Sequence, residues 1–145
     1  MELEKYSKPI EEQSTKLATI FTLNVRDSKM GRLWIPVFDH RFPLRFPLKF
    51  AYLSKIREKD NISGNHYHNV KEEIIIPLDG KFEFGLEDVK TQEKEKISIG
   101  SEENKAIYIR TGVSHKIISK GDTGILLVLA SNPSAPDDEI EYVIE

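Results

Sequence analysis

Two histidines stand two positions apart in the segment GNHYHNVKEEIIIPLDG, residues 64–80, of a chain that has only four. In a β-strand, alternate residues share a face, so His66 and His68 point to one side and Tyr67 to the other. Two imidazoles on one face can bind a metal ion or a polar ligand, and both titrate near neutral pH. Such a pair is more often merely exposed or hydrogen-bonded than functional, so the case for a site depends on further residues.

Two such residues complete a metal-binding set. Glu73 comes five positions after His68, and His115 ends the segment Arg-Thr-Gly-Val-Ser-His at the start of another predicted strand. Three imidazoles and one carboxylate suit Zn, Ni, Mn or Fe, with positions left open for water or substrate. The chain has no cysteine, which excludes thiolate ligands, disulfides and a cysteine nucleophile. No organic cofactor is expected.

Composition limits the classes of protein. The 145 residues are 39% hydrophobic and 31% charged, as in one soluble globular domain. A net charge of -3, with both signs interspersed, gives no reason to expect nucleic acid. No apolar run approaches the length of a membrane span, and the first twenty residues do not resemble a signal peptide. A cytoplasmic protein is the expectation.

The elements that must position these side chains are predicted to be strands. Residues 1–16 are polar and predict an arm or a short frayed helix before a barrel domain over 17–145. Residues 17–38 predict a hairpin with its turn at 26–31. Pro43 and Pro47 make 39–48 an extended crossing segment. Further strands are predicted over 48–57, 73–78, 81–87, 106–110, 115–119, 124–130 and 140–144.

The connections between these strands are short. Asp79-Gly80 predicts a two-residue hairpin turn between 73–78 and 81–87. Residues 87–96 and 132–139 are polar and predict loops. Many short strands at regular spacing favour an antiparallel sandwich or a small barrel.

Residues 64–119 resemble the cupin superfamily. The first cupin motif reads His-x-His, four residues, Glu, six residues, Gly, and the second contains Gly-x-x-His. The matching residues are His66, His68, Glu73 and Gly80, then Gly112 and His115. Arg110 replaces the usual proline of the second motif. The resemblance implies an all-β, double-stranded β-helix: an RmlC-like jelly-roll barrel.

Within that superfamily, the sequence is similar to the sugar-nucleotide 3,4-ketoisomerases (the WxcM-like branch), which are relatives of the deoxysugar 3,5-epimerases. RDSKMGRLWIPV resembles the N-terminal hairpin of that group, and FPLKFAYLSKI resembles its strand before His-x-His. There are departures. Ser63 and Met30 replace two arginines that can contact a sugar nucleotide, and Glu73 replaces the usual glutamine. These departures leave the specific substrate open, and they make the site residues more similar to those of a metal-binding cupin.

The first functional hypothesis is isomerisation of a nucleotide-linked keto-deoxysugar by a homodimer. The resemblance implies that His66 and His68 shuttle a proton between adjacent carbons, since an imidazole both takes and returns a proton at neutral pH. Tyr52 and Tyr108 are candidate hydroxyl donors or simply core residues. Candidate substrate contacts are Arg41, Arg45, Arg110 and Trp34. The alternative for Arg41 and Arg45 is a solvated loop charge, and for Trp34 it is core or interface packing.

Two other hypotheses keep the barrel. One is a metal-dependent oxygenase or isomerase that uses His66, His68, Glu73 and His115 as ligands. The other is a cupin that binds a sugar without catalysis. The isomerase and the metal enzyme compete for the same atoms, because a nitrogen bound to metal cannot act as a base.

Overall fold

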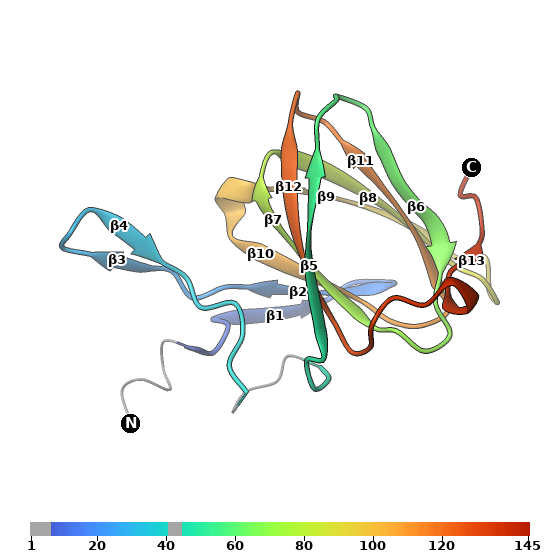
Figure 1. Cartoon of the computed structure of the whole chain (residues 1–145), viewed down its shortest axis with the longest axis horizontal. Coiled ribbons are helices and arrows are strands. Elements are labelled where there is room, and N and C mark those ends of the chain that lie inside the picture. Colours follow the sequence, from blue (N-terminus) through green and yellow to red (C-terminus); the bar gives the residue numbers. More distant parts are fainter. Residues whose placement is uncertain (1–6, 41–44) are drawn as a thin grey trace.

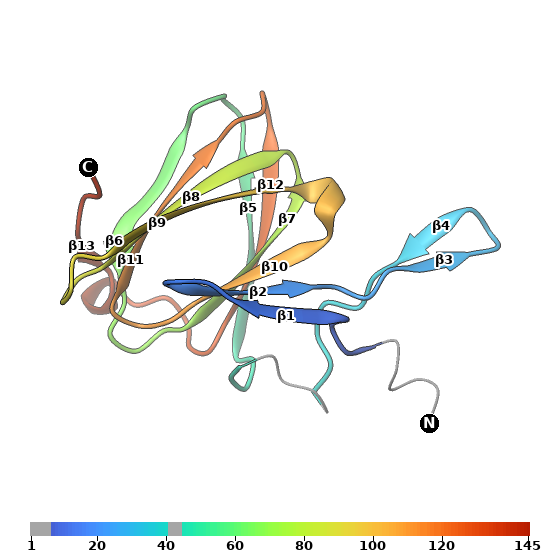
Figure 2. The same ribbon diagram turned by 180° about the vertical axis from the view of Figure 1, so that it is seen from behind.

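The computed structural model describes residues 7–40 and 45–145 and consists almost entirely of antiparallel strands. A six-stranded sheet has the order β1-β2-β10-β7-β12-β5, and a five-stranded sheet has the order β13-β6-β11-β8-β9. The two sheets face each other as a barrel, and the hairpin β3-β4 extends away from it (Figures 1 and 2). The predicted double-stranded β-helix is confirmed.

The strands belong to the two sheets and the projecting hairpin. The six-stranded sheet contains β1 (Glu11–Ser14), β2 (Ala18–Thr22), β10 (Lys105–Ile109), β7 (Glu73–Asp79), β12 (Gly124–Ala130) and β5 (Phe50–Ile56). The five-stranded sheet contains β13 (Ile140–Glu141), β6 (Ile62–Tyr67), β11 (Val113–Ser119), β8 (Lys81–Asp88) and β9 (Lys94–Gly100). The hairpin is β3 (Arg26–Ser28) with β4 (Arg32–Trp34), and two 3-10 helices are η1 (Ser101–Glu103) and η2 (Pro136–Asp138). No helix in the described ranges is long and apolar enough to cross a membrane.

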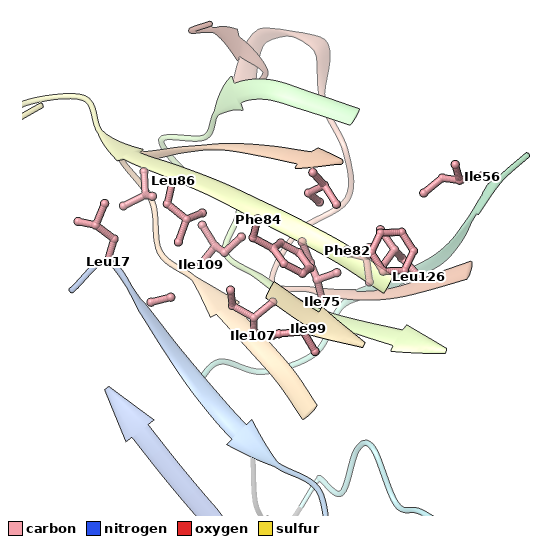
Figure 3. Close-up of a cluster of buried hydrophobic side chains, with 14 residues drawn as sticks. Leu17, Ile56, Ile75, Phe82, Phe84, Leu86, Ile99, Ile107, Ile109 and Leu126 are labelled. Carbon is pink, nitrogen blue, oxygen red and sulfur yellow. The ribbon is translucent and has the colours of Figure 1, made fainter. Parts of the chain in front are cut away.

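The main core fills the space between the two sheets. Alternate residues of β8, namely Phe82, Phe84 and Leu86, are almost completely buried and meet Ile75 and Ile107 from the opposite sheet (Figure 3). This period of two places the intervening residues of β8 on the outer face.

A second apolar cluster covers the outer face of the six-stranded sheet. It contains Phe21, Leu23, Phe46, Ile74, Ile76, Ala106 and Leu129. Ile35, Val37 and Leu48, from the segment that crosses the sheet, pack against it. Both faces of β7 are therefore buried, which explains its unbroken run of isoleucines.

The predicted hairpin over 17–38 is wrong in its pairing. β2 pairs with β1 and β10 as an internal strand of the large sheet, and only 26–34 form a hairpin. The reason is burial, because β2 packs its apolar side chains while β3 and β4 are mostly exposed. Residues 11–14, which were predicted to belong to an arm or a short frayed helix, form a strand. The division into an arm (1–16) and a barrel domain (17–145) stays a prediction.

The predicted hairpin turn at Asp79-Gly80 is also wrong. β7 and β8 belong to different sheets, so the chain turns a corner between sheets there. Only Gly80 of the two has a positive φ, of 96°, and a Cβ on it would lie 2.8 Å from the carbonyl oxygen of Thr123. The predicted loop over 87–96 contains the start of β9, whose charged outer residues concealed a strand.

Candidate functional site

The four predicted metal ligands converge from two sheets. His66 lies on β6, His68 directly follows that strand, His115 lies on β11, and Glu73 begins β7 across the barrel. One nitrogen from each of the three histidines lies within 4.8 Å of the others. The ring centroids of His66 and His115 are 4.7 Å apart, and those of His66 and His68 are 4.9 Å apart.

A bulge in β6 helps to turn His66 into the barrel. His115 pairs with His66, but the next residue, Lys116, pairs with Gly64, so Asn65 is the extra residue. Gly64 and Asn65 have φ of 94° and 58°, both in the left-handed region. A bulge re-aims the side chains next to it. The carbonyl oxygen and Oδ1 of Asn65 accept hydrogen bonds from the backbone of Tyr142 and Ile144, so the C-terminal segment fixes the bulge.

The Glu73 carboxylate lies at the centre of the site and is only 3% exposed. Its Oε1 is 3.1 Å from Nε2 of His68 and 3.6 Å from Nε2 of His115. Its Oε2 accepts a 3.3 Å hydrogen bond from the Tyr52 hydroxyl and lies 3.8 Å from the Lys71 amine. The Oε1–His68 contact is short but is not aligned as a hydrogen bond, so it is an electrostatic contact.

Asp138 fixes both His68 and the turn after it. Its backbone carbonyl oxygen lies 2.7 Å from Nδ1 of His68, and its carboxylate accepts the backbone N–H groups of residues 69, 70 and 71. If Nδ1 carries the proton, Nε2 of His68 is left facing Glu73. No sequence pattern pointed to this role, because Asp138 is one of several acidic residues in an unpatterned loop.

The three histidines differ in the direction in which their surroundings shift the pKa. Burial lowers the pKa of His115 to about 4, and burial together with the nearby His68 lowers the pKa of His66. Burial alone would lower the pKa of His68, but the contacts with Glu73 and the Asp138 carbonyl outweigh it, and the net shift is upward. Burial opposes ionisation of Glu73, yet His68, His115 and Lys71 hold its pKa at about 2.

A cavity of about 70 Å³ adjoins the cluster. Tyr52, Glu73, His66 and His115 line it, and side chains of the main core form much of the remaining wall. His66 also lines a shallow groove of about 380 Å³ on the outside, with Gly64, Asn65, Glu139, Glu141 and Val143. His66 is partly exposed, while His68, Glu73 and His115 are at most 4% exposed. His66 is thus the histidine that connects the interior with the surface.

The structure brings one predicted tyrosine to the site and not the other. Tyr52 reaches Glu73, and burial and that carboxylate raise the pKa of its hydroxyl. Tyr108 lies on the outer face of its sheet because its neighbours Ile107 and Ile109 point into the core. Its hydroxyl donates to Glu72, so it does not meet the histidines.

The predicted substrate contacts are not gathered at the histidines within one chain. Arg110 donates to Asp88 over 2.5 Å, and Arg45 pairs with Glu12 beside the Tyr108 ring. Trp34 is 40% exposed on the projecting hairpin, where it lines a hollow with Arg26 and Arg32. Arg41 lies outside the described residues.

The residues present fit a divalent metal ion. Nε2 of His68, Oε1 of Glu73 and Nδ1 of His115 are buried polar atoms without a hydrogen-bond partner in the described part of the chain. Buried polar atoms normally have a hydrogen-bond partner, so the lack of one at three atoms on three candidate ligands is consistent with atoms that coordinate a cation. The bond from Nδ1 of His68 to a backbone carbonyl is also the usual outer contact of a ligating histidine.

The barrel has the RmlC-like jelly-roll fold of cupins, as the sequence indicated. A family profile described as the polysaccharide biosynthesis C-terminal domain matches residues 51–139, more than half of the chain. The chain therefore belongs to that family. No curated protein matches the sequence significantly.

Solved structures with the same fold include two kinds of sugar-nucleotide enzyme. One is a dTDP-6-deoxy-D-glucose-3,5-epimerase from Legionella pneumophila, with a TM-score of 0.78, 13% identity and coverage of 90% of this chain and 76% of that one. Another is a sugar 3,4-ketoisomerase from Thermoanaerobacterium thermosaccharolyticum, in complex with TDP, with a TM-score of 0.75, 22% identity and coverage of 88% and 89%. A third is a 3,4-ketoisomerase from Helicobacter canadensis, with a TM-score of 0.75, 22% identity and coverage of 85% of this chain and 89% of that one.

Replacing Gly64 tests the bulge. A Cβ at Gly64 would lie 2.3 Å from the carbonyl oxygen of His115 and would also strain the positive φ, so Gly64→Ala should lower the free energy of unfolding by about 2 kcal/mol or more. Gly31→Ala is the control, because Gly31 has φ of 77° but nothing within 4 Å of the added carbon. Its cost should be about 1 kcal/mol. Urea unfolding measures both, and equal costs would contradict the close approach at Gly64.

Proposed function

We propose that this cupin is an enzyme that isomerises a keto-deoxysugar carried on a nucleotide, in the manner of a 3,4-ketoisomerase. The observation that carries the proposal is the position of His66. Among the four site residues it alone is partly exposed, and it touches both the inner cavity and the outer groove. A sugar at the mouth of the barrel can therefore reach an imidazole that is backed by His68 and His115.

The chemistry requires one group to move a proton between neighbouring carbons. His66 takes the proton from the carbon beside the ketone, the electron pair forms an enediolate, and a proton returns to the former carbonyl carbon. The C–H bond that breaks and the one that forms balance, so the reaction needs no oxidant. The hydroxyl on the carbon beside the ketone loses its proton as it becomes the new ketone, and the old carbonyl oxygen gains one. In the proposed reaction His68, which contacts the Asp138 carbonyl and Glu73, exchanges these two protons.

The size of the cavity favours a nucleotide bound outside the barrel. A volume of about 70 Å³ holds only a few small molecules such as water, whereas a nucleotide is several times larger. The groove beside His66 is larger, at about 380 Å³, and runs along β6 and the C-terminal segment. The sugar would lie at the mouth, with the nucleotide along the surface.

Exchange of substrate hydrogen with solvent tests the proposal. With dTDP-4-keto-6-deoxyglucose in deuterated water, NMR should show deuterium entering the sugar carbons next to the carbonyl. His66→Asn and His68→Asn should each slow this exchange at least about 100-fold, since an imidazole acting as acid or base contributes that much. His40→Asn is the control, because the His40 side chain is 85% exposed and pairs with its neighbour Asp39.

Wild-type protein that binds the nucleotide but exchanges no hydrogen would contradict the enzyme and favour a cupin that only binds sugar. Exchange that survives in His66→Asn would remove His66 from the reaction.

The unpaired buried atoms favour a second candidate, a metal-dependent cupin. His66, His68, His115 and Glu73 would hold a Zn, Ni, Mn or Fe(II) ion. When bound, such an ion stabilises negative charge on an oxygen of the ligand or lowers the pKa of bound water. In that case the protein residues orient the ligand, and His66 is not free to act as a base.

Substitution of the ligands separates the two candidates. If a metal is bound, Glu73→Gln should weaken its binding only partly, because three imidazoles remain, and His68→Ala should weaken it more. Elemental analysis after gel filtration of protein incubated with Zn, Ni, Mn and Fe(II) measures the content. Wild-type protein that stays free of metal would contradict the metal-dependent cupin. An unchanged rate of hydrogen exchange in Glu73→Gln would then agree with the metal-free isomerase.

We also propose that the protein is a homodimer. The hairpin β3-β4 extends from the barrel (Figures 1 and 2), and it carries exposed apolar side chains, with Met30 87% and Leu33 59% exposed. A two-stranded hairpin is marginally stable alone, so it needs a surface to pack on. The outer edge of β1 is also unpaired among the described strands and can pair with another chain.

Light scattering tests the dimer. The mass in solution should be twice that of one 16.7 kDa chain, and Leu33→Lys, which places a charge on the hairpin, should shift it toward the monomer. A single-chain mass for the wild type across the micromolar range would exclude the dimer.

A further inference from the structure

Lys71 is a buried cation directly behind the histidine site. Lys71 is only 3% exposed. Because a lysine is rarely buried without a partner, its contacts are informative. Its amine donates a 3.1 Å hydrogen bond to the Ser134 hydroxyl and lies 3.8 Å from Oε2 of Glu73. The amine is also 5.9 Å from the centre of the Tyr52 ring. The lysine therefore lies against the Glu73 oxygen that the histidines do not face.

The two oxygens of Glu73 have different surroundings as a result. Oε2 faces the Lys71 amine and accepts the Tyr52 hydroxyl, while Oε1 faces the Nε2 atoms of His68 and His115. A carboxylate is planar, so holding one oxygen by a cation and a hydroxyl fixes the direction of the other. Lys71 itself does not line the cavity. It acts on the site through Glu73 and is a positioning residue.

The chain holds Lys71 in this place from two sides. Its backbone N–H donates to the Asp138 carboxylate over 2.9 Å, which fixes the turn, and Ser134 holds the end of the side chain. Both partners belong to the segment between β12 and β13. A solvated lysine side chain would contact neither Ser134 nor Glu73, so the burial of this cation is a specific feature of the fold.

The charge of Lys71 acts on any metal ion that Glu73 would bind. A divalent ion at Oε1 and the histidine nitrogens would share one carboxylate with an ammonium group, and like charges repel strongly where the surroundings are buried. We propose that Lys71 holds Oε2 of Glu73, aims Oε1 at His68 and His115, and lowers the affinity of the site for divalent ions. The contacts of Lys71 carry this inference, which does not depend on the substrate.

Zinc binding tests the role without any substrate. Lys71→Met keeps the length and apolar stem of the side chain and removes its charge, so it should bind Zn²⁺ about tenfold more tightly than wild type or better, measured by competition with a chromophoric chelator. Lys71→Arg keeps the charge and should stay near wild type. Lys94→Met is the matched control, because Lys94 is an exposed lysine that also pairs with a buried glutamate, Glu87, and its loss should leave zinc affinity unchanged.

A second measurement reports the direction of Glu73. In metal-free protein, the ring ¹H–¹⁵N signals of His68 and His115 should shift in Lys71→Met and stay in place in Lys94→Met. Ser134→Ala, which frees the end of the lysine but keeps its charge, should shift them less. It also provides a test if Lys71→Met does not fold, in which case unchanged ring signals in Ser134→Ala would overturn the inference.

The outcomes are distinct. Tighter zinc binding by a folded Lys71→Met protein, with shifted ring signals, supports the inference even if the protein never exchanges sugar hydrogens. A zinc affinity of Lys71→Met that is equal to or weaker than that of the wild type overturns the proposal that Lys71 lowers the affinity for divalent ions. If neither protein binds zinc, the ring signals decide, and unchanged signals overturn the positioning role.

Discussion

The site depends on one buried carboxylate, that of Glu73. An ionised group removed from water is costly unless other charges and hydrogen bonds compensate it. Glu73 has these on both sides, with histidines at one oxygen and Lys71 and Tyr52 at the other. These partners come from β5, β11 and the turn before β7, so the charge of Glu73 links elements that are far apart in the sequence. The barrel must close around the site for the carboxylate to be satisfied.

The C-terminal segment is the second part of this construction. Asp138 fixes the turn that carries Lys71 with its carboxylate and contacts His68 with its backbone carbonyl. The backbone of Tyr142 and Ile144 fixes the bulge at Asn65. Each end of the His-x-His segment is thus tied to residues about seventy to eighty positions later in the chain. The histidines are held in place because both of their neighbouring backbone segments are fixed.

Local spacing and the cupin resemblance were enough to predict the cluster and most of the strands. His66, His68, Glu73 and His115 are brought together as their motif indicates, and strands β5, β7, β8, β10, β11 and β12 lie close to their predicted ranges. Pairing that depends on partners elsewhere could not be predicted in this way. A dipeptide such as Asp79-Gly80 allows a hairpin and a sheet corner alike, and burial of the two β7 faces decides between them. Asp138, Ser134 and Lys71 were missed because their roles are tertiary contacts without a periodic pattern.

The placement of cations distinguishes this site from a simple three-histidine metal centre. Two of the arginines predicted as substrate contacts are engaged elsewhere in the described chain, Arg45 with Glu12 and Arg110 with Asp88. Lys71 is the cation found beside Glu73 in the described ranges, and the motif does not contain it. It does not line the cavity, so it is not placed to neutralise a phosphate there.

Under the proposed function, a nucleotide at the mouth of the barrel would need positive charge from another surface. The projecting hairpin, with Arg26, Lys29 and Arg32 around Trp34, carries such charge, but it extends away from the barrel that holds His66 (Figures 1 and 2). A second copy of the chain, placed so that its hairpin packs against this barrel, would cover the exposed apolar side chains of the hairpin.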